Sequence, residues 1–191
     1  MVLAGLMALL VSCASGNIVL PRIDTPPHHV KTGERMLEMR KLEAAYREFE
    51  RALDLDPKYA PAFIGISLVH GLRSEYPPGV RALDQADRLA RGKAQEMAVY
   101  VGWMRFLLIG GEHFDPDWLA RVEKTFSQAV ILDNEDPAPH YYLGLAYKEA
   151  RQYDRAAKHF YRVMEMGGAY SAAASEEYRL AEEMGKTTPT R

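Results

Sequence analysis

From about residue 30 onward, the pattern of apolar and polar positions is helical almost everywhere, and the strict alternation typical of strands does not occur. Glycine or proline interrupts the pattern repeatedly, at Pro57, Pro77-Pro78, Gly110-Gly111, Pro137 and Gly167-Gly168. The sequence therefore predicts an all-α chain in which short turns separate successive helices. The regular spacing of the interruptions also suggests that one unit is repeated along the chain.

Two segments 111 residues apart share one arrangement of small and aromatic residues. In the first, Gly33 is followed twelve residues later by Ala45, and then come Phe49 and Ala52. In the second, the same offsets hold Gly144, Ala156, Phe160 and Val163. A third segment repeats the latter half with Val122, Phe126 and Ala129, and Gly102 is the small residue upstream of it.

These motifs resemble the tetratricopeptide repeat, a pair of antiparallel helices of about 34 residues. Leu143, Gly144 and Tyr147 match the Leu-Gly-x-x-Tyr motif of its first helix, and Ala156 and Phe160 match the second helix. The resemblance implies a right-handed α-solenoid of about four helix-turn-helix units at residues 30–185. The units are expected at about residues 26–59, 60–94, 95–136 and 137–170, with a capping helix at 171–185.

The repeat also accounts for glycine within a helix. We expect Gly144 to face Ala156 across its hairpin, so that close packing of the two backbones offsets the helix penalty of glycine, about 1 kcal/mol. The predicted core positions are Gly33, Ala45, Phe49, Ala52, Gly102, Phe126, Ala129, Leu143, Gly144, Tyr147, Ala156 and Phe160.

In arrays of this kind, the first helix of each unit lines a concave surface that binds a peptide or helix. The matching positions are Val30, Glu34 and Leu37; Ile64, Leu68 and Gly71; Val99, Trp103 and Phe106; Tyr141, Leu145 and Lys148. Trp103 and Tyr141 are the strongest candidates, because rigid aromatic residues contribute much of the energy of protein interfaces. The alternative is that the insertion Gly-Gly-Glu-His-Phe-Asp-Pro-Asp-Trp of the third unit buries Trp103 or Phe106.

The first residues form an uncharged apolar stretch that ends near Cys13, the single cysteine of the chain. This stretch is shorter than the roughly 18 residues that span a bilayer, and it fits a secretory signal better. Residues 10–13, Leu-Val-Ser-Cys, resemble the lipobox of bacterial lipoproteins, although no Lys or Arg precedes the apolar run. We expect a signal peptide at residues 1–12, lipidation of Cys13 and a tether at residues 13–29. The alternative is a short apolar segment with a buried thiol.

Charge and motifs argue against several other functions. A formal net charge of −2 provides no basic surface for nucleic acid, so no nucleic-acid partner is expected. The sequence contains no HExxH, Gly-x-Ser-x-Gly or P-loop motif, and we expect neither catalysis nor a cofactor. His28-His29 is expected to be a solvated pair in the tether, and His140 and His159 are expected to be separate packing residues.

One polar cluster leaves an alternative open. Glu112, His113, Asp115 and Asp117 could together bind a divalent metal in a small hydrolase. Asp115-Pro116-Asp117 is also typical of the start of a helix, where a capping residue, a proline and an acidic residue are favoured, and we prefer this interpretation.

The sequence as a whole predicts a non-catalytic scaffold that binds a protein or peptide partner in its concave groove. The lipobox resemblance predicts a lipid anchor in the bacterial cell envelope, with the domain facing the periplasm and a role in envelope assembly, such as pilus, secretion or cell-wall machinery. Two alternatives remain, a metal-dependent hydrolase and a soluble cytoplasmic adaptor without lipid.

Overall fold

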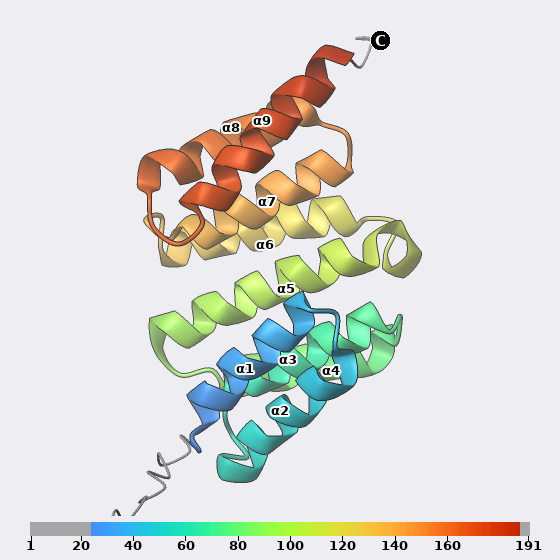
Figure 1. Cartoon of the computed structure of the whole chain (residues 1–191), viewed down its shortest axis with the longest axis vertical. Helices are drawn as coiled ribbons and strands as arrows, with labels where there is room; N and C mark the ends of the chain where they lie inside the picture. The colour runs from blue at the N-terminus through green and yellow to red at the C-terminus, as the bar shows by residue number, and fades with distance from the viewer. Residues whose placement is uncertain (1–23, 188–191) are drawn as a thin grey trace, which may run out of the picture.

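The computed structural model describes residues 24–187, and nearly all of them are helical (Figure 1). The helices are α1 (Pro26–Glu38), α2 (Leu42–Leu55), α3 (Ala60–Leu72), α4 (Tyr76–Leu89), α5 (Gly92–Phe114), α6 (Trp118–Leu132), α7 (Pro137–Glu149), α8 (Tyr153–Met166) and α9 (Ser171–Thr187). No strand occurs within residues 24–187. The predicted all-α class is confirmed.

Consecutive helices pack as hairpins, α1 with α2, α3 with α4, α5 with α6 and α7 with α8 (Figure 1). The hairpins stack in chain order, because α3 contacts α1 and α5, and α5 contacts α7. The last helix, α9, packs against α8 and α7 and covers the end of the array. The described chain is therefore an α-solenoid of four hairpins with a closing helix, as predicted.

Three of the hairpins share one type of turn, in which a single non-glycine residue has a positive φ angle. These residues are Arg40 at 58°, Ser74 at 61° and Arg151 at 58°. In each turn the next N–H donates to a carbonyl five residues earlier, from Lys41 to Met36, from Glu75 to His70 and from Gln152 to Tyr147. Arg40 and Ser74 are 34 residues apart, so the backbone itself repeats with the predicted period.

Glycines make room for aromatic rings between helices. A Cβ atom added to Gly33 would lie 2.5 Å from the ring of Phe49, and one added to Gly65 would lie 2.3 Å from the same ring. Phe49 of α2 therefore lies between α1 and α3. In the fourth hairpin, the nearest atoms to a Cβ at Gly144 belong to the ring of Phe160, at 2.7 Å. Gly144 therefore accommodates an aromatic ring, and its expected packing against Ala156 stays a prediction.

The third hairpin differs from the others because α5 is 23 residues long. The helix is interrupted at Gly111, whose backbone angles, φ 50° and ψ −146°, are not helical. After this kink, the ring of Phe114 packs against that of Phe106, with ring centroids 5.3 Å apart. Most of the predicted insertion thus extends α5, and only residues 115–117 link it to α6.

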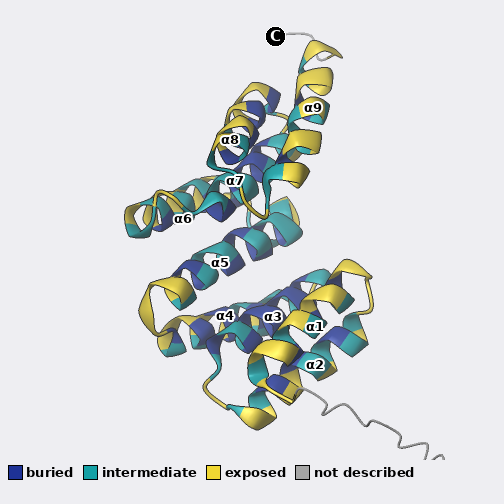
Figure 2. Ribbon diagram, turned by 60° about the vertical axis from the view of Figure 1, so that its left-hand side comes forward, coloured by how far each residue is buried: buried dark blue, intermediate teal, exposed yellow. Residues whose placement is uncertain are grey.

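The helix α5 belongs to both clusters of buried side chains. Val99 and Phe106 lie in the cluster formed mainly by α1 to α4, whereas Met104 and Leu107 lie in the cluster formed with α6 to α9. Figure 2 shows buried residues on α5 where it lies between the two groups of helices. One helix therefore forms a wall of both halves of the core.

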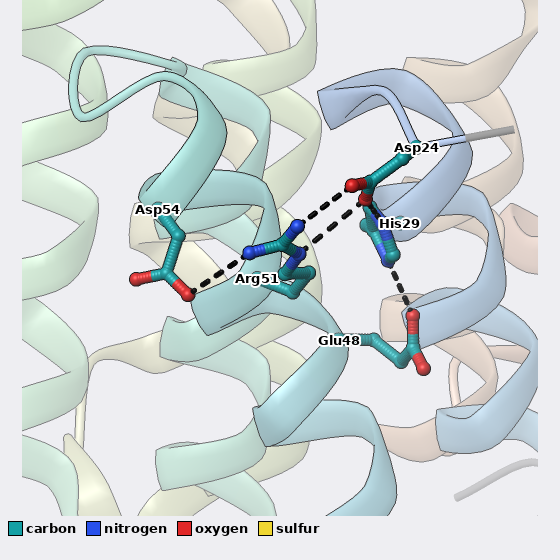
Figure 3. Close-up of polar contacts among 5 residues, drawn as sticks. All are labelled: Asp24, His29, Glu48, Arg51 and Asp54. Carbon is teal, nitrogen blue, oxygen red and sulfur yellow. Dashed lines mark hydrogen bonds and ion pairs between the residues drawn. The ribbon is translucent and has the colours of Figure 1, made fainter.

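The first helix overlaps the end of the tether that was expected at residues 13–29. Because α1 begins at Pro26, residues 26–29 of the expected tether are helical. His29 is 8% exposed, and its ring bonds Glu48 at 2.7 Å and Asp24 at 2.8 Å (Figure 3). Arg51 of α2 also contacts Asp24, at 2.6 Å. The expectation of a solvated His29 is therefore wrong, because two carboxylates satisfy its ring nitrogens inside the fold.

The remaining N-terminal predictions, the signal peptide at residues 1–12 and lipidation at Cys13, lie outside the described residues. Across residues 24–187, no helix combines the length and the apolar character needed to cross a membrane.

Candidate functional site

The inner side of the solenoid carries two adjoining hollows, which we call the inner groove. The first, of about 300 Å³, is lined by α1, α3, α5, α7 and the segment before α9, with apolar walls from Val30, Pro61, Ile64, Ala98, Val101 and Ala138. The second, of about 320 Å³, has apolar walls from Leu37, Leu68, Leu72 and Ile109, and the charged residues Glu38 and Arg40 also line it. Arg105 of α5 lines both hollows and marks the point where they meet.

Polar and aromatic side chains extend from Arg105 across the groove. Nη1 of Arg105 lies 3.5 Å from Oε1 of Glu34 on α1, and its guanidinium carbon lies 5.7 Å from the ring centre of Tyr142 on α7. Tyr142 contacts Tyr170 with ring centroids 6.0 Å apart, and Tyr170 contacts Tyr141 at 5.0 Å. These contacts connect the first hairpin to the segment that precedes α9.

The hydroxyl groups of Tyr170 and Tyr141 stay neutral. Burial raises the pKa of Tyr170 well above its ordinary value, and the neighbouring Tyr142 and Glu34 raise it further. Burial also raises the pKa of Tyr141. The charged residues that line the first hollow are Arg105, Glu34 and Asp136, and Tyr170 adds an aromatic side chain to its wall.

Comparison with known proteins gives no family and several related folds. No family model matches the chain, and no curated protein matches it. The crystal structure of the APC/C hetero-tetramer Cut9-Hcn1 is similar at a TM-score of 0.57 and 20% identity, covering 85% of this chain. The match covers only 30% of that longer chain. Together with the stacked hairpins, this similarity decides the architecture. The fold is a tetratricopeptide-type solenoid.

Two further structures are more distant. YrrB, described as a TPR protein with an unusual peptide-binding site, has a TM-score of 0.45 and 17% identity, with 83% of this chain and 76% of that chain covered. MamA has a TM-score of 0.42 and 14% identity, with 84% of this chain and 86% of that chain covered.

In the first two hairpins of the tetratricopeptide-type solenoid, the predicted groove residues lie on the inner side. Glu34 and Ile64 line the first hollow, and Leu37 and Leu68 line the second. Leu68 is almost fully buried, so it forms the floor of its hollow. On α1 the lining residues Val30, Glu34 and Leu37 follow the predicted spacing of four and three, whereas on α3 the predicted Gly71 is buried beside Phe106 and lines neither hollow.

On α5 the predicted residues do not line the groove. Val99 is 1% exposed and Phe106 is 0% exposed, so both belong to the core. Trp103 lines a different hollow of about 520 Å³ between α4, α5 and α6, and the guanidinium carbon of Arg121 lies 5.8 Å from its ring centre. These three assignments are corrected: Ala98, Val101 and Arg105 face the inner groove instead.

The error on α5 comes from its helical register. When Gly102 is aligned with Gly33, the expected groove positions fall about one residue too far toward the C-terminus of α5. One residue corresponds to a rotation of roughly 100° around the helix, so the expected side chains point away from the groove. A Cβ at Gly102 would lie 2.7 Å from Ile64 of α3, so this glycine packs against the preceding hairpin. Phe126, expected in its core, is partly buried on the other side and contacts the fourth hairpin.

The predicted residues of α7 are occupied by contacts within the array and line neither hollow. Lys148 forms a hydrogen-bonded ion pair with Glu177 of α9. Leu145 packs against the C-terminal core, and Tyr141 lies among Tyr142, Tyr170 and Phe160. Their assignment to an open groove is corrected, because α9 and the segment before it pack against this part of α7.

The acidic cluster after α5 forms a turn. Asp115 accepts a hydrogen bond from the backbone N–H of Asp117 at 2.9 Å and pairs with Arg121 at 2.5 Å. The Arg121 hydrogen bond lowers the pKa of Asp115. Residues 24–187 contain no group of three or more His, Cys, Asp or Glu side chains placed to hold a metal ion. The local contacts are those of a turn leading into α6, which begins at Trp118.

Two histidines that the sequence suggested were separate are paired. Nδ1 of His140 and Nδ1 of His159 lie 3.0 Å apart, beneath the edge of Phe126. Burial lowers the pKa of both rings, and that of His159 falls to about 4 with a further contribution from His140. Both rings are therefore neutral at pH 7, and the N–H of one Nδ1 donates a hydrogen bond to the unprotonated Nδ1 of the other.

The 111-residue offset between the first and fourth units could have indicated the pairing of His140 with His159. His140 and His159 stand 111 residues after His29 and Glu48, so both pairs occupy the same place in their hairpins. The groove residue that sequence reasoning missed is Arg105, which lies one residue before the predicted Phe106.

Proposed function

We propose that the chain is a non-catalytic scaffold that binds a segment of a partner protein in the inner groove. The observation that carries the proposal is the joining of two apolar hollows at Arg105, across helices of all four hairpins. Apolar hollows supply contact area, and a small number of polar groups fixes the orientation of a bound segment. The tetratricopeptide-type fold is consistent with this use, although such a scaffold can serve many partners.

We also propose that the chain is a lipoprotein of the bacterial cell envelope, anchored through Cys13 and facing the periplasm, where it acts in envelope assembly such as pilus, secretion or cell-wall machinery. The support is the lipobox resemblance of residues 10–13. The α1–α2 end of the array, where Asp24 is bound by Arg51 and His29, is then the end nearest the membrane.

Site-specific photo-crosslinking in the source cells tests the groove. A photo-reactive amino acid at Ala98, which lines the first hollow, is expected to give discrete adducts of higher mass with a partner. The matched control is the same amino acid at Lys158, an exposed position of α8 outside both hollows. Identical adducts from the two positions, or none from Ala98, contradict the assignment of the groove.

Membrane fractionation tests the anchor separately. The wild-type chain is expected in the membrane fraction, and Cys13→Ala is expected to move to the soluble fraction because it removes the lipid attachment. Wild-type protein that is already soluble favours the cytoplasmic adaptor instead.

A further inference from the structure

Arg105 differs from the other arginines of comparable burial in the described chain. Its side chain is 26% exposed, yet it makes no hydrogen bond to any residue within 24–187, and its nearest approach to Glu34 is 3.5 Å. Arg73, which is 22% exposed, donates to Glu43 at 2.5 Å. A partly buried cation whose donors lack acceptors loses hydration without gaining hydrogen bonds in return. Arg105 therefore has donors available for a bound group.

The neighbours of Arg105 leave its guanidinium well placed for a carboxylate. The aromatic face of Tyr142 lies 5.7 Å from the guanidinium carbon, and such a contact leaves the N–H edges of an arginine free. Glu34 is half-exposed, and the nearest approach of its carboxylate to the guanidinium is 3.5 Å. A planar guanidinium binds a carboxylate best through two parallel hydrogen bonds, a geometry that Glu34 does not provide.

The position of Arg105 restricts where that carboxylate lies in a ligand. Hollows with apolar walls adjoin the arginine on both sides, one walled by Val30, Ile64 and Val101 and the other by Leu37 and Leu72. The first is also lined by the carboxylates Glu34 and Asp136, and the second by Glu38 and Arg40. A terminal carboxylate at Arg105 would leave one of the hollows empty. A side-chain carboxylate within a segment allows apolar residues to fill both.

We propose that Arg105 selects partner segments in which an aspartate or glutamate is flanked on both sides by apolar residues. This inference rests on the proposed function, because it names the partner chemistry of the same groove. The carboxylate of the partner replaces Glu34 at the guanidinium and forms the paired hydrogen bonds that Arg105 lacks. Glu34 then acts as an internal competitor for the same cation.

A displayed library of random peptides, selected on the purified domain, supplies the probe. Wild-type protein is expected to enrich peptides with one acidic residue between apolar residues. The best peptide is then synthesised with its acidic residue intact and with the corresponding amide, and binding is measured by fluorescence anisotropy. The amide peptide is expected to bind wild-type protein about tenfold more weakly, as expected for a charge-assisted pair worth about 1.4 kcal/mol.

Variants of the protein then test whether the preference for the acidic peptide over the amide peptide comes from Arg105. Arg105→Gln is expected to weaken the acidic peptide about tenfold and to leave the amide peptide unaffected, so that the two changes are not additive. Glu34→Gln is expected to tighten the acidic peptide several-fold, because the competing carboxylate is removed. Arg47→Gln, on an exposed part of α2 outside both hollows, is the matched control and should change neither affinity.

The outcomes separate this inference from the proposed function. Equal binding of the acidic and amide peptides to wild-type protein overturns the role of Arg105, and the groove assignment survives if Ala98→Trp still abolishes binding. If enriched peptides bind Ala98→Trp normally, the groove assignment itself fails. Circular dichroism of each variant confirms that it is folded, and the comparison of the two peptides requires no variant at all.

Discussion

Glu34 on α1 and Arg105 on α5 form an ion pair, 3.5 Å apart, although these two helices do not pack against each other. The pair therefore joins the first and third hairpins across the inner groove, past the intervening α3. A contact between the first and third hairpins depends on how the hairpins stack along the whole array. The ion pair breaks if a bound ligand draws Arg105 away from Glu34.

The Glu34–Arg105 pair should contribute little to stability. Arg105→Gln and Glu34→Gln are each expected to change the free energy of unfolding by less than about 1 kcal/mol, because a long, partly solvated ion pair gains little over hydration. Urea unfolding followed by circular dichroism measures this. A loss of several kcal/mol would mean that the pair holds the array together, and the proposed binding role would then have to be separated from folding.

Gly144 should be intolerant of a side chain. Gly144→Ala places a methyl group 2.7 Å from the ring of Phe160 and is expected to destabilise the chain by about 1 to 3 kcal/mol through overpacking. Gly185→Ala is the matched control, since the nearest atom to its Cβ lies 3.6 Å away, and it is expected to stabilise α9 by about 0.5 to 1 kcal/mol. The double variant Gly144→Ala, Phe160→Leu should recover part of the loss. Equal effects at both glycines would contradict the packing described for Phe160.

The His140–His159 pair should make stability fall in acid. The pKa of His159 is lowered from 6.5 to about 4 in the folded chain, so the unfolded chain binds more protons between these values. The stability that neutral His159 contributes to the folded chain is therefore fully present above pH 6.5 and is lost as the pH falls toward 4. We expect His159→Gln to show a smaller drop in melting temperature than wild type between pH 7.5 and pH 4.5. The exposed His28→Gln serves as control and should behave like wild type.

His29 should show the opposite dependence. Desolvation would lower the pKa of His29, but the hydrogen bonds that its ring donates to Glu48 and Asp24 outweigh desolvation and raise the pKa above 6.5. Its ion pairs are therefore fully present below pH 6.5 and are lost as the pH rises through the folded pKa. His29→Gln is expected to destabilise the chain more at pH 6 than at pH 9. The same loss at both values would show that His29 contributes through packing alone.

The fold could be predicted from residue spacing within single hairpins, whereas several groove residues could not, because contacts between residues far apart in the sequence place them. The spacing of Gly33 and Phe49, repeated in Gly144 and Phe160, reflects a ring that packs into the space left by glycine within one hairpin, so it can be read from sequence. The register of α5 depends instead on how its extended end folds Phe114 over Phe106.

The loss of the α7 positions from the groove has the same kind of cause. Lys148 is engaged by Glu177, which lies 29 residues away on a helix that the repeat motif does not contain. The sequence indicated a capping helix but could not show which residues of α7 it would contact. Arg105 likewise matters through Glu34 and Tyr142, which lie far from it along the chain.

Because α5 supplies Phe106 to one cluster of buried residues and Leu107 to the other, neither half of the chain is a self-sufficient fragment. Truncation after α4 would remove the ring that fills the space beside Gly79, where an added Cβ would lie 2.4 Å from Phe106. A fragment starting at α6 would lack Met104 and Leu107. Any minimal version of this protein must therefore retain α5, whichever end is shortened.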